Sequence, residues 1–172
     1  MRNICLVVAL FAMAAPSFAA QHSFGLGYSR SDIGDGDHLN GGNIKYGYQP
    51  DDSALGLITS VTLTGDSDKN QQDGVKTDGT LGYGSLMIGA TYQITDWVKP
   101  YAMVGVGRAG YKIDVSYAGN KETIKDHDTA FSYGAGLQIE PVKDIFIDLG
   151  YEGSRLFDTQ VKTFTAGAGY RF

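Results

Sequence analysis

The last ten residues of the chain, 163–172, alternate between two kinds of side chain with a period of two. One face carries Phe164, Ala166, Ala168, Tyr170 and Phe172, and the other carries Thr, Gly and Arg. A pleated strand separates successive side chains in this way, whereas a helical repeat mixes them. An apolar face that ends in aromatic residues, backed by small and polar residues, is typical of a transmembrane β-barrel strand. If the chain folds in this way, its other strands must show the same two faces.

Seven earlier segments repeat the alternation, and each has a face of Leu, Ile, Val, Ala or aromatic residues opposite a face rich in Gly, Ser and Thr. With the closing segment, the predicted strands are 22–31, 42–49, 54–64, 80–93, 99–112, 129–140, 145–155 and 160–172. The sequence therefore predicts an all-β fold, an eight-stranded antiparallel up-and-down transmembrane β-barrel that acts as a monomer.

The connections between these segments predict the orientation of the barrel. Outer-membrane barrels keep short turns on the periplasmic side and longer loops outside the cell. The short connections are 50–53, 94–98 and 141–144, and they alternate with polar loops at 32–41, 65–79 and 113–128 and a brief link at 156–159. We therefore expect an outer-membrane protein whose two termini lie in the periplasm and whose polar loops are extracellular.

Residues 1–19 have the features of a secretory signal peptide rather than of the barrel. Arg2 supplies a positive charge, residues 4–15 form an apolar run, and small residues precede a cleavage site after Ala19 or Ala20. The run is shorter than the roughly 20 residues that a membrane anchor helix needs. We therefore divide the chain into a signal peptide, 1–19, and a barrel domain, 20–172.

Charge and cysteine content exclude several classes of function. The only cysteine, Cys5, lies in the predicted signal peptide, so the barrel domain has no thiol for a disulfide, a nucleophile or a metal site. Without Arg2, the 14 Lys and Arg residues become 13 against 19 Asp and Glu, a formal net charge of −6. This acidic balance argues against a nucleic-acid partner.

A soluble eight-stranded carrier has the same strand count, but its large apolar side chains line an internal cavity. Here the apolar faces lack charges at their centres and carry tyrosines near their ends, whereas the glycine-rich faces carry the charges. We expect the glycine-rich faces to enclose a narrow lumen filled by small residues and an ion cluster. Its predicted members are Lys45, Glu140, Asp148, Glu152 and Arg171, with Arg171 near Glu140 and Asp148, and Lys45 nearer Glu152. We interpret this cluster as structural rather than catalytic.

Several motifs resemble the Ail/Lom/OmpX family of small outer-membrane barrels across the whole barrel domain. They are Gly42-Asn43-Ile44-Lys45-Tyr46, Tyr101 through Gly105-Val106-Gly107, residues 132–138, Asp148 with Tyr151-Glu152 and Ser154, and the ending 167–172. The family usually has arginine at the position of Gly47 and asparagine at that of Glu140, which implies a rewired interior charge network. The resemblance implies adhesion to host cells or matrix, complement resistance or envelope protection, with host-surface or complement proteins as partners.

A lipid-modifying enzyme is the main alternative, because lipid A deacylases and acyl transferases also use eight-stranded barrels. A deacylase needs serine, histidine and a carboxylate in register. The three histidines, His22, His38 and His127, lie at a strand start or in loops, and none accompanies an outward serine. His38 and His127 with Asp35, Asp37, Asp126 and Asp128 have metal-ligand chemistry, but solvated loop residues explain them more simply. We predict no catalytic residue, metal or cofactor.

Basic residues follow the last apolar residues on the outward face of several predicted strands, at the predicted external edge of the membrane. They are Arg30, Arg108, Arg155 and Lys162. Because the last two strands and the first are neighbours in a closed barrel, Arg30, Arg155 and Lys162 form one predicted patch at headgroup height. Such cations suit lipopolysaccharide phosphates. Ordinary snorkelling at the membrane boundary explains them equally well.

The closing strand also resembles the terminal signal that the barrel-insertion machinery reads. The residues that carry this resemblance are Thr165, Gly167, Tyr170 and Phe172. It implies the insertion machinery as a partner during assembly.

Overall fold

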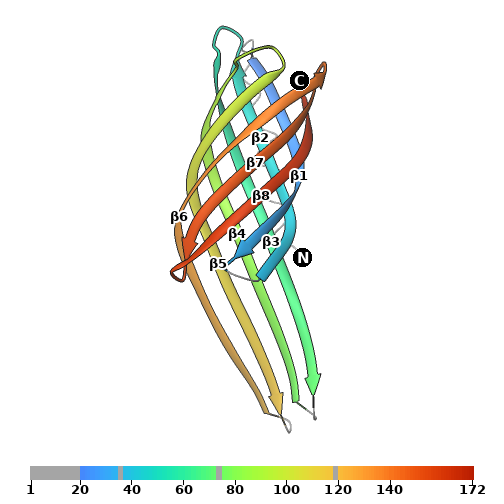
Figure 1. Cartoon of the computed structure of the whole chain (residues 1–172), viewed down its shortest axis with the longest axis vertical. Coiled ribbons are helices and arrows are strands. Elements are labelled where there is room, and N and C mark those ends of the chain that lie inside the picture. Colours follow the sequence, from blue (N-terminus) through green and yellow to red (C-terminus); the bar gives the residue numbers. More distant parts are fainter. Residues whose placement is uncertain (1–19, 35–36, 73–74, 118–119) are drawn as a thin grey trace.

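The computed structural model describes residues 20–34, 37–72, 75–117 and 120–172, so the predicted signal peptide lies outside the described residues. Eight antiparallel strands close into one barrel in sequence order, which confirms the predicted fold (Figure 1). The strands are β1 (Ala20–Ile33), β2 (Asp37–Pro50), β3 (Leu55–Gln72), β4 (Val75–Tyr92), β5 (Val98–Tyr117), β6 (Asn120–Val142), β7 (Ile145–Leu156) and β8 (Thr159–Arg171). No helix in these ranges is long and apolar enough to cross a bilayer.

The first and last strands complete the barrel. β1 pairs with β8 from Ser23↔Arg171 to Ile33↔Val161, and the backbones of His22 and Phe172 exchange two hydrogen bonds of 2.8 Å. Ala20 and Phe172 therefore lie at one end of the barrel, together with the short connections β2–β3, β4–β5 and β6–β7. We name this the turn end, and the opposite end the hairpin end.

The hairpin end differs from the prediction, because most residues of the two longest expected loops are strand. β3 and β4 remain paired as far as Gln72↔Val75, and β5 and β6 as far as Tyr117↔Asn120. β4 and β5 pair out to Lys76↔Ser116. Four strands therefore continue beyond β1, β2, β7 and β8, and they reach well below these strands in Figure 1. We name this extension of β3–β6 the projecting sheet.

The expected loop at 32–41 is also mostly strand, since β1 and β2 pair as far as Ile33↔Asp37. The prediction of loops was wrong for a physical reason. Alternation of apolar and polar residues reports burial of one face of a sheet. A sheet that stands in water has no lipid face, so its hydrogen-bonded pairing continues where the alternation stops.

The two faces of the barrel strands have the predicted directions. Large apolar residues such as Leu26 (57% exposed) and Leu86 (59% exposed) point outward, where lipid covers a membrane barrel. The inward face is buried and mostly polar, and it includes Ser29, Asn43, Ser60 and Thr62. This arrangement is the reverse of a soluble carrier with an apolar cavity.

The lumen contains larger side chains than the small residues and ions expected from the sequence. Tyr83, Tyr101 and Phe146 all point inward and are buried. Phe146 fits because glycine lies opposite it: a Cβ at Gly25 would lie 3.2 Å from Cζ of Phe146, and one at Gly169 would overlap the ring. The inward glycines therefore make room for a few large side chains rather than leaving a pore.

An apolar cluster closes the lumen toward the hairpin end. Its buried members are Leu39, Tyr83, Ala109, Leu156 and Val161. Between this cluster and the turn end, the interior is polar. The charged groups of the lumen are therefore separated from the hairpin end by packed apolar side chains.

Candidate functional site: the filled lumen and the hairpin end

The centre of the lumen holds a buried ion pair that joins two strands which are not neighbours in the barrel. The ammonium of Lys45 on β2 contacts the carboxylate of Asp148 on β7, and both side chains are almost fully buried. Lys45 also donates to the hydroxyls of Tyr101 (2.7 Å) and Thr165 (3.1 Å). The Tyr101 hydroxyl and the Gln138 amide donate to Asp148 at 3.0 and 3.2 Å. The pair is thus surrounded by the additional hydrogen bonds that a buried ion pair requires.

Glu152 lies one layer nearer the hairpin end, and its neighbours differ from the prediction. Its carboxylate accepts hydrogen bonds from Thr62 (2.9 Å) and Ser85 (2.7 Å) and a longer one from Ser60 (3.5 Å). Lys45, expected near Glu152, pairs with Asp148 instead. Hydroxyl donors rather than a cation therefore satisfy this buried carboxylate.

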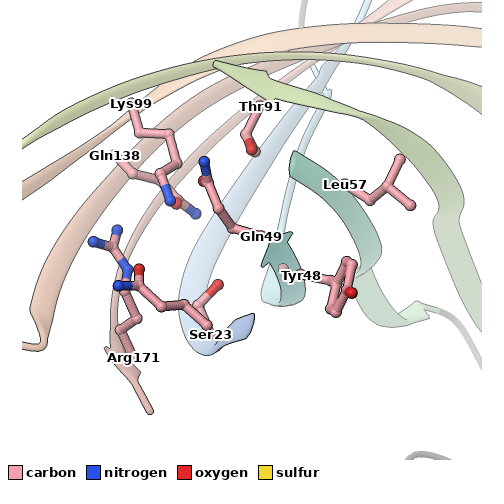
Figure 2. A pocket seen from close by; sticks show the side chains of 10 residues that line it. Ser23, Tyr48, Gln49, Leu57, Thr91, Lys99, Gln138 and Arg171 are labelled. Carbon is pink, nitrogen blue, oxygen red and sulfur yellow. The ribbon is translucent and has the colours of Figure 1, made fainter. Parts of the chain in front are cut away.

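A second ion pair lies at the turn end, where Arg171 of β8 contacts Glu140 of β6. Arg171 was expected near both Glu140 and Asp148, but Asp148 belongs to the Lys45 pair. Lys99, which was not predicted as a member of the cluster, is buried beside this pair and points inward from the start of β5 (Figure 2). Its parity with Tyr101 and Met103 on the inward face is the signal that identifies it.

Three of the predicted basic residues lie on neighbouring strands at the hairpin end. Lys162 of β8 lies opposite Asp32 of β1 and Gly153 of β7, and Arg30 lies opposite Phe164, two residues further along β8. Arg155 follows Gly153 by two residues on β7, and all three basic side chains are exposed. The patch also contains one carboxylate. Asp32 lies opposite Lys162, and its carboxylate oxygen lies 3.4 Å from Nε of Arg30.

Arg108 lies apart from the other three basic residues. It is exposed on β5, opposite Gly84 of β4 and Thr129 of β6. The fourth predicted cation therefore lies beside the base of the projecting sheet rather than in the patch on β7, β8 and β1.

The three histidines are separated from one another. Nδ1 of His22 lies 2.7 Å from the Tyr46 hydroxyl at the turn end, and Nδ1 of His38 lies 2.7 Å from the Asp32 carboxylate at the hairpin end. His127 is exposed on β6. Asp35 lies outside the described residues. Within the described residues, no three His, Cys, Asp or Glu side chains are grouped so as to hold a metal ion.

The tip of the β7–β8 hairpin rests against the base of the projecting sheet. Phe157 and Asp158 form its two-residue turn with φ values of 49° and 58°, in the left-handed region. The backbone N–H of Phe157 donates to Asp128 on β6 at 2.7 Å, and its ring lies 6.0 Å from that of Tyr111 on β5. These contacts connect the short β7–β8 hairpin to the long β5–β6 hairpin.

The residues of the predicted insertion signal divide between the two faces of β8. Thr165 is buried in the lumen, where it accepts from Lys45, and Gly167 lies opposite Gly27. Tyr170 and Phe172 are exposed on the outer face at the turn end. The closing strand therefore presents aromatic side chains outward and a polar network inward.

The sequence is similar to known outer-membrane proteins along its whole length. The sequence model of the outer membrane protein beta-barrel domain matches residues 4–172. Outer membrane protein X of Escherichia coli is 37% identical over the full length of both chains. The virulence membrane protein PagC of Salmonella typhimurium is 36% identical over 90% of this chain and 88% of its own length. The chain belongs to the Ail/Lom/OmpX family of outer-membrane β-barrel proteins.

A solved structure from the family agrees with this assignment. Crystalline Ail, the attachment invasion locus protein of Yersinia pestis, in complex with the heparin analogue sucrose octasulfate, superposes with a TM-score of 0.79. Its sequence is 32% identical, and the match covers 90% of this chain and all of that chain. The predicted family, barrel fold and outer-membrane location are thereby confirmed. These relatives are named as outer-membrane, virulence or attachment proteins rather than as enzymes.

Proposed function

We propose that this member of the Ail/Lom/OmpX family acts at the cell surface through its hairpin end, in adhesion, complement resistance or envelope protection. The observation that carries this proposal is the projecting sheet. It extends past the barrel wall, whereas the lumen is filled by buried side chains, and the two cavities described within it are each about 10 Å³. Because short turns of outer-membrane barrels are periplasmic, we assign the turn end with both termini to the periplasm and the hairpin end to the cell exterior.

The projecting sheet has two strand edges that no other strand of the barrel covers. β2 pairs with β3 only as far as Asn40↔Gly65, although β3 continues to Gln72. β7 pairs with β6 only from Ser132↔Ser154, although β6 begins at Asn120. Unpaired N–H and C=O groups on a sheet edge bind extended segments of other proteins by adding a strand. This geometry favours a protein partner, such as a host-surface or complement protein.

The basic patch gives the hairpin end a second class of partner. Arg30, Arg155 and Lys162 lie where the outward face leaves the apolar belt, at the height of anionic headgroups. Guanidinium groups bind phosphate or sulfate oxygens in a bidentate manner. Yersinia pestis Ail forms a complex with a sulfated sugar, which supports a polyanion-binding role. For this chain, lipopolysaccharide phosphates are the anions nearest to the patch.

Substitution of the patch tests the lipopolysaccharide proposal separately. Replacing Arg30, Arg155 and Lys162 with alanine is expected to lower lipopolysaccharide retention by the purified barrel. Arg108→Ala, outside the patch, is the matched control and is expected to retain it. Equal retention by the triple variant and the unchanged protein contradicts the proposal.

A lipid-modifying enzyme is the second candidate class, and the geometry favours it less. His22 is engaged by a tyrosine and His38 by Asp32, and no serine contacts either ring among the hydrogen bonds of the described residues. Lipid A mass spectra of cells with and without the protein separate the two classes. We expect identical acyl patterns. A new or missing acyl chain would favour the lipid-modifying enzyme over the surface protein.

Exchange of single hairpins tests which part carries the activity. Residues 66–81 lie between the paired positions Gly65↔Gly82, and residues 110–127 lie between Ala109↔Asp128. Each segment can therefore be replaced by an Asn-Gly turn that joins strand ends already opposite one another. Loss of matrix binding or serum survival in one truncation, with normal amounts of barrel in the outer membrane, locates the activity. Full activity in both truncations contradicts the proposal.

Two assembly steps complete the proposal. Residues 1–19 direct export and are removed after Ala19 or Ala20, and the barrel-insertion machinery reads β8 through Thr165, Gly167, Tyr170 and Phe172. The alternating faces and the aromatic terminus of this strand support the second step.

A further inference from the structure

The turn end of the lumen contains buried polar groups that lack partners. The Lys99 side chain is 6% exposed, and its ammonium has no hydrogen bond or ion pair among the described residues, although the nitrogen atom itself keeps some contact with solvent. Arg171 contacts Glu140 through one terminal nitrogen, but its Nε is buried without a partner in the described chain. Oε1 of Gln49 is buried and unpaired in the same sense. Buried groups left unsatisfied in this way are costly, and they indicate a missing partner.

These groups surround one small cavity. Its lining includes Gln49, Thr91, Lys99, Gln138 and Arg171, and the cavity volume is about 10 Å³. Figure 2 shows the side chains of Lys99, Gln49, Gln138 and Arg171 converging on it from different strands. A space of this size holds one particle about as large as a water molecule. Sulfate, phosphate and lipid headgroups are too large for it.

The charges around the cavity do not balance. Lys99 interacts electrostatically with the cation of Arg171 and with the single carboxylate of Glu140. Asp148 is held by Lys45, and Glu152 lies four residues further along β7, roughly 13 Å toward the hairpin end. Two cations therefore share one carboxylate. A water molecule satisfies hydrogen bonds but not this excess charge, whereas a small anion satisfies both.

We propose that the turn end of the lumen binds one small monovalent anion, such as chloride. Nζ of Lys99 and the Nε–H of Arg171 donate to it from β5 and β8. The Lys99 ammonium has three protons, so a second proton is available to Oε1 of Gln49. The anion joins β5 and β8, which are not neighbouring strands, and neutralises the charge at this end of the lumen. This inference does not depend on the proposed surface function.

Bromide provides a direct probe, because it resembles chloride and scatters anomalously. The full barrel, purified in detergent and crystallised in sodium bromide, is expected to show an anomalous peak between Lys99 and Arg171. Density at this position without an anomalous signal identifies water and overturns the proposal. This measurement needs no variant, so it remains decisive if a substitution prevents folding.

Unfolding experiments test the same site in solution. At constant ionic strength, replacing gluconate, which is too large for the cavity, with chloride is expected to raise the urea midpoint in a saturable manner. Lys99→Met is expected to abolish this rise. Lys143→Met removes an exposed lysine from the same end of the barrel and is expected to preserve it. An equal response of Lys99→Met and Lys143→Met contradicts the proposal.

Discussion

At the scale of single residues, the lumen is held together by charges that are paired across the barrel. Lys45 and Asp148 come from β2 and β7, which are not neighbouring strands, and both side chains are more than nine-tenths buried. Removing one member of such a pair leaves an uncompensated buried charge, whereas removing both avoids this penalty. The pair therefore specifies how distant strands meet more than it adds net stability.

The burial of this ion pair predicts the behaviour of a double-mutant cycle. Lys45→Met is expected to lower the free energy of unfolding in detergent micelles by about 3–5 kcal/mol, because Asp148 loses its cation. The double variant Lys45→Met/Asp148→Asn is expected to recover most of this loss, since Tyr101 can still donate to the asparagine oxygen. A double variant as unstable as Lys45→Met alone contradicts the account.

The inward glycines predict a second difference between otherwise similar substitutions. A Cβ at Gly150 would lie 2.5 Å from the Tyr101 hydroxyl and 2.6 Å from that of Thr165, within the Lys45 network. A Cβ at Gly42, on the outer face, would meet only a backbone oxygen at 3.6 Å. Gly150→Ala is therefore expected to cost about 1–3 kcal/mol in urea unfolding. Gly42→Ala is expected to leave the free energy of unfolding almost unchanged. An equal loss of stability in both variants would contradict the explanation that the inward glycines provide space for side chains in the lumen.

The parity of the sequence predicts that Lys45, Asp148, Glu152 and Arg171 point inward, but it does not predict their partners. Parity gives the face of a strand, whereas contact across the lumen depends on the stagger between strands that are not neighbours. For this reason Lys45 was expected beside Glu152 and lies beside Asp148. Lys99 was missed because it stands at the beginning of its strand, where the alternation is hardest to read.

At the scale of strands and hairpins, residue composition predicts the connections at the turn end of the barrel but not those at the hairpin end. The expected turn at 50–53 agrees with the end of β2 at Pro50 and the start of β3 at Leu55, because Pro, Asp and Ser mark turns in any setting. At the hairpin end, polar residues were interpreted as loops although they continue as paired strands. Polar composition identifies exposure to water, not the absence of backbone pairing.

Amide exchange tests whether the projecting sheet persists in solution. β4 and β5 are paired on both sides, so their amides between residues 76–81 and 110–116 are expected to exchange slowly. In β3 beyond Gly65 and in β6 before Ser132, only the amides that face the neighbouring strand should be protected. Uniformly fast exchange through all four segments contradicts a persistent sheet.

The closing strand predicts a separation of assembly from activity. Phe172 lies at the turn end, where its backbone pairs with His22 and its side chain is exposed. Deleting Phe172 is expected to reduce the amount of heat-modifiable barrel in the outer membrane several-fold, because the insertion signal is lost. Surface activity divided by the amount of assembled barrel should be unchanged, and Phe164→Leu on the same face serves as the control. A fall in activity per assembled barrel contradicts this assignment.

At the scale of the whole molecule, the barrel is a filled support for an exposed sheet. Ion pairs, hydroxyl networks and an apolar cluster occupy its interior, and the two cavities described within the lumen are each about 10 Å³. Eight strands leave room for side chains rather than for a channel. The external contacts that we propose therefore belong to the projecting sheet of β3–β6 and to the basic patch on β7, β8 and β1.

The most direct test of this account is the surface activity of a barrel that lacks the whole projecting sheet. Both segments, 66–81 and 110–127, are replaced by Asn-Gly turns, and serum survival and matrix binding are measured per assembled barrel in intact cells. The account predicts a heat-modifiable outer-membrane barrel that has lost these activities to the level of cells without the protein. Activity equal to that of the full chain, from the same amount of barrel, would contradict it.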